Sequence, residues 1–165
     1  GIAVEAELGA VMGHESGPMP PYEELFATGK GFTDPAEAKC FVEETGVDWL
    51  SVAVGSVHGA MTASRHEKKI EARLSIERLY AIRESVNIPL VLHGGTGIRK
   101  EYVISAIRHG IAKINVATAI RQPYESLVAS DPEGALRAVY EATVAVIRED
   151  LELEGSAAVI RPNEA

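Results

Sequence analysis

Two stretches decide the fold: WLSVAVGSVHG at residues 49–59 and PLVLHGGTG at residues 89–97. Each joins a nearly continuous apolar run to a His-Gly pair. Consecutive apolar residues are typical of strands that are covered on both faces in a parallel sheet. Shorter runs of the same kind occur at residues 2–8 and 111–116. We therefore expect four strands.

Helical patterns follow these runs. Residues 34–45 begin with Asp-Pro, which is a capping residue before a proline at the first helical position, and they end at Gly46. We also expect helices at residues 75–86, 99–109, 123–128 and 133–153. Alternating strands and helices predict right-handed βαβ units around a parallel sheet. Four strands fit half of an eight-stranded barrel, which needs about 250 residues, and they also fit a small open sheet.

Composition limits the class of protein. The 165 residues are 46% hydrophobic and 24% charged, which is typical of one globular domain, here residues 1–165. A net charge of -8 argues against nucleic-acid partners, and no apolar run is long enough to span a bilayer. The only cysteine, Cys40, fits a reducing compartment, so we expect a cytoplasmic protein. Because the chain starts inside a strand-like segment without Met, we expect further residues before it.

One segment has little hydrophobic period. Residues 13–33 contain four glycines and three prolines, and they are longer than a usual connection. We expect a mobile or functional loop there, and an irregular tail at residues 155–165. Glu15 lies in the loop, where a mobile carboxylate can reach a substrate proton, although a surface role is the simpler interpretation.

Ligands of parallel α/β folds bind at the carboxyl ends of the strands. His58 and His93 both follow apolar runs at such ends. A neutral imidazole there is a good zinc ligand, although a structural hydrogen bond is the simpler interpretation of a single one. Two equivalent His-Gly pairs favour metal ligation. Glu7, at the end of the first run, fits a metal ligand, a proton-transfer group or a solvated carboxylate.

A phosphate site is predicted beside them. Gly94, Gly95 and Thr96 precede a helix, so that backbone N–H groups, a hydroxyl and the helix dipole can converge on an anion. Residues 115–118 end the last strand in the same way. Together these loops match the position where barrels often bind phosphate.

Four motifs resemble the C-terminal half of the class II aldolases, which include the fructose-bisphosphate and tagatose-bisphosphate enzymes. They are VEAELG at residues 4–9, TDPAEAKCFVEETGVDWLSVAVGSVHG at 33–59, PLVLHGGTG at 89–97 and KINVAT at 113–118. The resemblance covers about residues 2–127. It implies a (β/α)8 TIM barrel, of which this chain would supply the fifth to eighth strands and the C-terminal helices.

The resemblance also implies an activity in carbohydrate metabolism and glycolysis. The family reversibly cleaves a ketose 1,6-bisphosphate to dihydroxyacetone phosphate and an aldehyde, with zinc stabilising the enediolate. His58 and His93 would be zinc ligands, and Glu15 would be the proton-transfer group. Glu7 would lie at a second or alternative metal position, where another metal ion or a monovalent cation could bind. The residues implied in binding phosphate and hydroxyls are Gly59, Gly94, Gly95, Thr96, Asn115, Val116, Ala117 and Thr118.

The chain also departs from the family pattern. The third zinc histidine and the adjacent acidic aspartate would form an Asp-His pair, and the 165 residues contain none. We therefore expect this chain alone to be inactive and, as half a barrel, to form a homo-oligomer. The NVAT motif at residues 115–118 favours the tagatose type. The alternatives are a non-catalytic phosphate-binding half-barrel or interaction module, and a metal-free isomerase of phosphosugars.

Overall fold

The computed structural model describes residues 1–11, 21–57 and 71–160. The chain forms two compact units, which divide between Val116 and Ala117. The prediction that residues 1–165 form one domain stays a prediction. In the part of the chain that the structure describes, no helix combines the length and the apolar character needed to cross a membrane.

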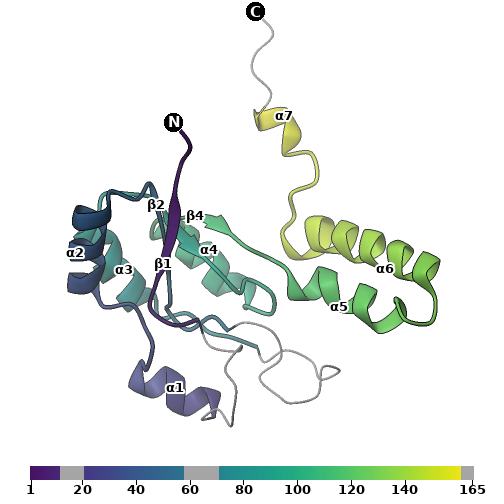
Figure 1. The fold of residues 1–165 in the computed structure, drawn as a ribbon, viewed down its shortest axis with the longest axis horizontal. Helices are drawn as coiled ribbons and strands as arrows, with labels where there is room; N and C mark the ends of the chain where they lie inside the picture. The colour runs from purple at the N-terminus through teal and green to yellow at the C-terminus, as the bar shows by residue number, and fades with distance from the viewer. Residues whose placement is uncertain (12–20, 58–70, 161–165) are drawn as a thin grey trace, which may run out of the picture. The chain divides into compact units, whose positions relative to one another are not determined.

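The first unit is built on a parallel four-stranded sheet (Figure 1). Its strands are β1 (Glu5–Leu8), β2 (Trp49–Val52), β3 (Leu90–Leu92) and β4 (Ile111–Ile114), in the order β1-β2-β3-β4. All three neighbouring pairs are parallel. The predicted parallel α/β fold is therefore confirmed, and each predicted apolar run contains one of the strands.

Three helices alternate with these strands: α2 (Pro35–Thr45), α3 (Ile76–Ser85) and α4 (Lys100–Arg108). The expected cap before α2 is confirmed, and α3 is capped in a similar way. The Asp34 carboxylate accepts the N–H groups of Ala36 and Glu37, and the Ser75 hydroxyl accepts that of Arg78. Helix α2 ends at Gly46, whose φ of 65° is the left-handed conformation that glycine adopts without strain.

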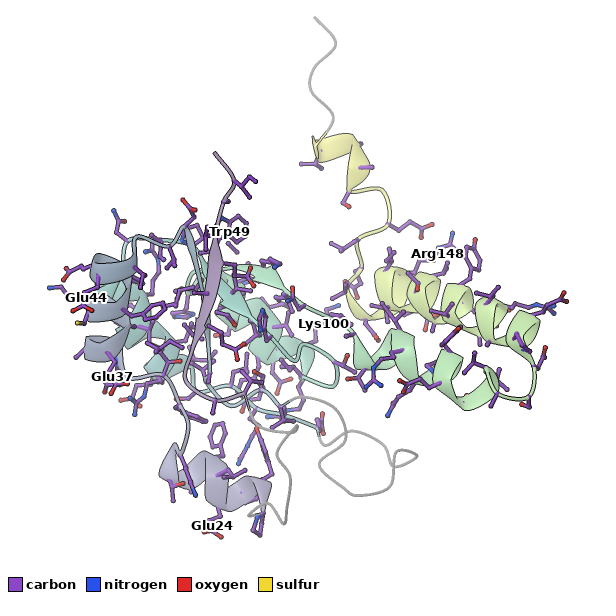
Figure 2. The ribbon with its side chains drawn as sticks, viewed as in Figure 1. Glu24, Glu37, Glu44, Trp49, Lys100 and Arg148 are labelled. Atoms are coloured by element: carbon purple, nitrogen blue, oxygen red, sulfur yellow. The ribbon has the colours of Figure 1, made fainter. Side chains whose placement is uncertain are left out.

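One face of the sheet carries the hydrophobic core. Leu50, Leu90 and Leu92 point from β2 and β3 into a cluster with Leu79 and Ile82 of α3, and all five are fully buried. Burying such a side chain contributes about 1.5–3 kcal/mol. The outer sides of the helices are polar: Glu37 and Glu44 project from α2 into solvent (Figure 2). The helices therefore cover this face and bury its strand side chains.

A short helix, α1 (Tyr22–Thr28), occupies part of the predicted loop 13–33. Tyr22 and Leu25, one turn apart, are both buried, and two apolar residues are too few for the period to be recognised in the sequence. The Tyr22 hydroxyl donates to the Gly55 and Arg73 carbonyls at 3.1 and 3.0 Å and accepts the Arg73 N–H at 2.7 Å. Burial raises the pKa of Tyr22. The predicted mobility of the loop stays a prediction.

The second unit is helical. It contains α5 (Thr118–Leu127), α6 (Pro132–Ala145), the π-helical turn η1 (Val146–Asp150) and α7 (Ala157–Ile160), and α5 packs against α6 (Figure 1). The predicted helix start at Pro123 is wrong, because this proline lies inside α5. Proline is common at a first helical position; inside a helix it removes one hydrogen bond and its ring clashes with the carbonyl four residues before it, which costs about 3 kcal/mol. Helix α7 lies in the segment predicted as a tail.

Candidate active site

The face of the sheet opposite the helices is polar at its edges. The strand register aligns Glu7 with Ser51, Ser51 with Val91, and Val91 with Lys113. Residues paired in this way point to the same face, and residues two apart on one strand share it. Glu5 and His93 therefore lie on the face of this row, and the leucines of the core lie on the other.

His93 is the centre of this polar face. It follows β3 directly, and its Nδ1 lies 2.5 Å from Oε2 of Glu7. Its Nε2 lies 3.0 Å from Oε1 of Glu5. Each ring nitrogen therefore has a carboxylate oxygen, which is a hydrogen-bond acceptor, within hydrogen-bond distance. The His93 side chain is 21% exposed, which leaves it partly accessible from solvent.

Glu5 connects His93 to the opposite edge of the sheet. Its Oε2 accepts a hydrogen bond of 2.7 Å from the Lys113 ammonium, which comes from β4. Lys113 holds the pKa of the Glu5 carboxyl below its usual value; partial burial opposes this effect, and His93 adds to it. The Glu5 carboxylate is therefore bonded on both oxygens, to one cationic side chain from β4 and one imidazole after β3.

Thr33 fixes the carboxyl ends of β1 and β2 to each other. Its buried hydroxyl donates to the Leu8 carbonyl at 2.6 Å and accepts the Ala53 N–H at 2.8 Å. A Cβ on Gly9 would lie 2.8 Å from this hydroxyl, so the turn after β1 has room only for glycine. The Ser51 hydroxyl adds a 3.3 Å bond to Glu7. Hydrogen bonds to β2 and to Thr33 thus hold the end of β1, where Glu7 lies, in place.

The loop after β3 is packed against both neighbouring strand ends. A Cβ on Gly94 would lie 2.7 Å from the Val57 carbonyl oxygen, and one on Gly95 would lie 2.6 Å from Ile114. The Gly95 N–H donates to the Asn115 carbonyl at 2.9 Å. This N–H is therefore committed to the backbone of the next loop. Because Gly95 has no side chain, the two loops approach each other closely here, and its role in binding phosphate stays a prediction.

The donor types on this face suit a metal. An imidazole nitrogen and a carboxylate oxygen are the ligands that zinc takes together with water or further histidines. Within residues 1–11, 21–57 and 71–160, no group of three or more His, Cys, Asp or Glu side chains is arranged to hold a metal ion. The donor atoms of His93 and Glu7 are thus of the kinds that zinc binds.

The predicted site residues divide into three groups. The first unit contains His93, Glu7, Gly94, Gly95, Thr96, Asn115 and Val116, all at the carboxyl ends of its strands. Ala117 and Thr118 belong to the second unit, in which Thr118 is the first residue of α5. Glu15, His58 and Gly59 lie outside the described residues.

Sequence reasoning missed two members of this face, Glu5 and Lys113. A usable signal was present. Glu5 and Glu7 alternate with Ala6 and Leu8, and Lys113 stands two residues before Asn115 on the last strand. Period-two alternation places each of these pairs on one face. Glu5 and Lys113 lie inside strands, whereas most of the predicted site residues follow the strands.

The comparisons with known proteins match nearly the whole of this chain. The family model for class II fructose-bisphosphate aldolase matches residues 1–158. The YdjI aldolase from Escherichia coli K12 is 33% identical with a TM-score of 0.65, over 97% of this chain and 51% of that chain. A putative fructose-1,6-biphosphate aldolase from Coccidioides immitis is 27% identical with a TM-score of 0.59, over 96% and 49%.

Fructose-bisphosphate aldolase from Campylobacter jejuni shares the fold, at 20% identity and a TM-score of 0.54, over 94% of this chain and 50% of that chain. The chain thus spans about half the length of each of these solved structures. The match to the family model covers nearly all of this chain and includes every strand of the described sheet. The chain therefore belongs to the class II fructose-bisphosphate aldolase family.

Proposed function

We propose that this chain supplies the metal-binding and phosphate-binding half of a class II aldolase, which cleaves a ketose 1,6-bisphosphate to dihydroxyacetone phosphate and an aldehyde. The observation that carries the proposal is the position of His93. It stands at the carboxyl end of β3, with its ring nitrogens against two carboxylates from β1. Parallel α/β enzymes place their chemistry at this end of the sheet.

Curvature of the sheet supports half a barrel. Strands lie about 4.8 Å apart, so β1 and β4 would be roughly 14 Å apart in a flat sheet. The Lys113 and Glu5 side chains nevertheless meet at 2.7 Å across the two strands between them. Side chains stand nearly perpendicular to a sheet, so they converge across such a span when the sheet curls toward them. A curled, all-parallel sheet with helices on its outer face is the arrangement of a TIM barrel.

For the metal, we propose His58 and His93 as ligands and Glu7 as a second or alternative one. Val57, the residue before His58, lies against Gly94, the residue after His93. This contact between the two loops favours a shared ion. Zinc bound there would supply Lewis-acid polarisation of the substrate's ketone carbonyl.

For the substrate, we propose that the loops after β3 and β4 hold its phosphate and hydroxyl groups. Gly94 and Gly95 allow close approach, and Thr96 and Asn115 offer side-chain polar groups beside them. Glu15 would transfer the proton at the carbon next to the carbonyl. The NVAT motif at residues 115–118 supports a ketose of the tagatose type. Roles for Gly59, Val116, Ala117 and Thr118 stay predictions.

Carbon–carbon cleavage also needs an acid that protonates the leaving aldehyde's oxygen. The family motif for that acid, an Asp-His pair, does not occur in the 165 residues. We therefore propose that this chain binds the metal and the three-carbon phosphate without cleaving a ketose bisphosphate by itself.

The test is a titration of the chain with dihydroxyacetone phosphate, with zinc and after removal of zinc, beside an assay of fructose and tagatose 1,6-bisphosphate cleavage. We expect zinc-dependent binding of dihydroxyacetone phosphate, no binding of unphosphorylated dihydroxyacetone, and no cleavage. Equal binding without zinc would favour a non-catalytic phosphate-binding module. Rapid cleavage by this chain alone would contradict the proposed need for a missing acid.

Self-association is a further part of the proposal. In the described sheet, β1 and β4 each have a neighbour on one side only. Open edges of this kind present unpaired backbone groups that favour pairing with another chain. Sedimentation of the purified chain should therefore give a mass above that of one 17.6 kDa chain.

A further inference from the structure

His93 has a carboxylate against each of its ring nitrogens, and a metal ligand cannot keep both. A histidine that binds a metal gives one nitrogen to the ion, and the other nitrogen usually donates its N–H to a carboxylate that fixes the ring. One of the two glutamates would then keep its hydrogen bond to His93, and the other would face the ion. The surroundings of Glu5 and Glu7 differ enough to assign these tasks.

Glu5 is the more firmly held of the two. Its second oxygen bonds to the Lys113 ammonium at 2.7 Å, and its side chain is 27% exposed. The Glu7 side chain is 37% exposed, and besides its contact with His93 it accepts a hydrogen bond of 3.3 Å from the Ser51 hydroxyl. The Lys113–Glu5 bond is short and joins two opposite charges, whereas the Ser51–Glu7 bond is long and has a neutral donor. Glu5 is therefore the carboxylate suited to hold the ring, and Glu7 is the one able to turn toward an ion.

Lys113 is itself fixed relative to His93. It pairs with Val91 in the β3–β4 register, and Val91 lies two residues before His93 on the same face of β3. The contacts form a closed circuit: β4 carries Lys113, Lys113 holds Glu5, Glu5 holds the Nε2 of His93, and β3 returns to β4 through backbone hydrogen bonds. A side chain in such a circuit cannot rotate without breaking a charged contact.

We propose that Lys113 and Glu5 are positioning residues that hold the His93 imidazole so that its Nδ1 side, next to Glu7, receives the metal. The proposal rests on the proposed metal-binding function. The positive charge of the Lys113 ammonium offsets the negative charge of Glu5, which is the second carboxylate beside the His93 imidazole. Without it, the repulsion between Glu5 and Glu7 turns Glu5 away and releases Nε2.

The test uses the chain with Lys113→Met and with Glu5→Gln, in two measurements. The first is zinc affinity by calorimetry, with the metal alone as the probe. Loss of a carboxylate that orients a metal-binding histidine typically weakens metal affinity about 10–100-fold, and we expect both variants in this range. Lys113→Arg, which keeps the cation, should stay closer to the parent than Lys113→Met. Lys39→Met, which removes an exposed lysine 3.9 Å from Glu43 on α2, is the matched control and should bind zinc as the parent does.

The second measurement needs no metal. The ¹⁵N resonances of the His93 imidazole report the hydrogen-bond partner of each ring nitrogen, and Lys113→Met should shift the Nε2 resonance more than the Nδ1 resonance. If the parent binds no zinc, the proposed metal site fails, and these resonances still decide the positioning claim. Unchanged His93 resonances in Lys113→Met and Glu5→Gln would overturn the inference. So would parental zinc affinity in both variants of a chain that binds zinc.

Discussion

The two faces of the sheet differ in chemistry although they share the same four strands. On the helix face, Leu50, Leu90 and Leu92 pack against Leu79 and Ile82 with no exposed surface. On the other face, Glu5, Glu7, His93 and Lys113 form a partly exposed chain of charged contacts. Alternation along each strand lets neighbouring residues serve different tasks. The comparison teaches that stability depends mainly on one face and the candidate chemistry on the other.

The largest expected effect is on the helix face. Leu79→Ala should lower the free energy of unfolding by about 2–5 kcal/mol, because it removes a fully buried side chain and leaves a cavity. Chemical denaturation measures this loss. Leu136→Ala, at a position that is 63% exposed, should change it by less than about 0.5 kcal/mol. Equal losses in the two variants would mean that the cluster around α3 is not the core.

At the loop after β3, the relevant comparison is between Gly94→Ala and Gly46→Ala. The two glycines have similar φ values, 70° and 65°, so each substitution costs about 1 kcal/mol of backbone strain. A Cβ at Gly94 would also lie 2.7 Å from the Val57 carbonyl oxygen, whereas one at Gly46 meets nothing within 4 Å. Overpacking of this kind adds about 1–3 kcal/mol. Gly94→Ala should therefore have the lower melting temperature, and the reverse order would contradict the contact between the two loops.

Thr33→Val tests the connection between the strand ends. The substitution keeps the shape of the side chain and leaves the partly buried Leu8 carbonyl and the buried Ala53 N–H without this partner. We expect a loss of about 1–3 kcal/mol in denaturation experiments. The hydroxyl of Thr45 also bonds to a carbonyl, but at an exposed position, so Thr45→Val should lose less. Similar losses in the two variants would show that burial of the Thr33 hydrogen bonds does not increase their contribution to the free energy of unfolding.

The smallest effect on stability is expected on the polar face. A double-mutant cycle of Lys113→Met and Glu5→Gln should give a coupling of about 0.2–1 kcal/mol that falls with added salt, because the pair is partly exposed. Lys113 lowers the pKa of Glu5, so the coupling is complete above the pKa of about 4.3 of an unfolded glutamate. It is lost as the pH falls through the lower pKa of the folded chain. A coupling that grows at acid pH would contradict this assignment.

Much of the helix face could be predicted from the sequence. The composition of WLSVAV and PLVL alone predicts buried strands. The helix caps at Asp34 and Ser75 depend only on residues close by in the sequence. Contacts on the polar face join residues that are 44 to 108 positions apart, and no local pattern brings them together. The hydrogen bond of the Gly95 N–H to Asn115 likewise depends on the packing of two loops.

The account depends most directly on His93 as a metal ligand. The decisive measurement is zinc affinity, by calorimetry, of the chain and of its His93→Ala and His109→Ala variants. His109 caps α4, with its Nδ1 2.7 Å from the Ser105 carbonyl, and has no assigned role at the site. Loss of His93 should weaken zinc binding by more than the roughly 100-fold expected for loss of a ligand's hydrogen-bond partner, and loss of His109 should leave it unchanged. Zinc binding of parental strength in His93→Ala would contradict the account.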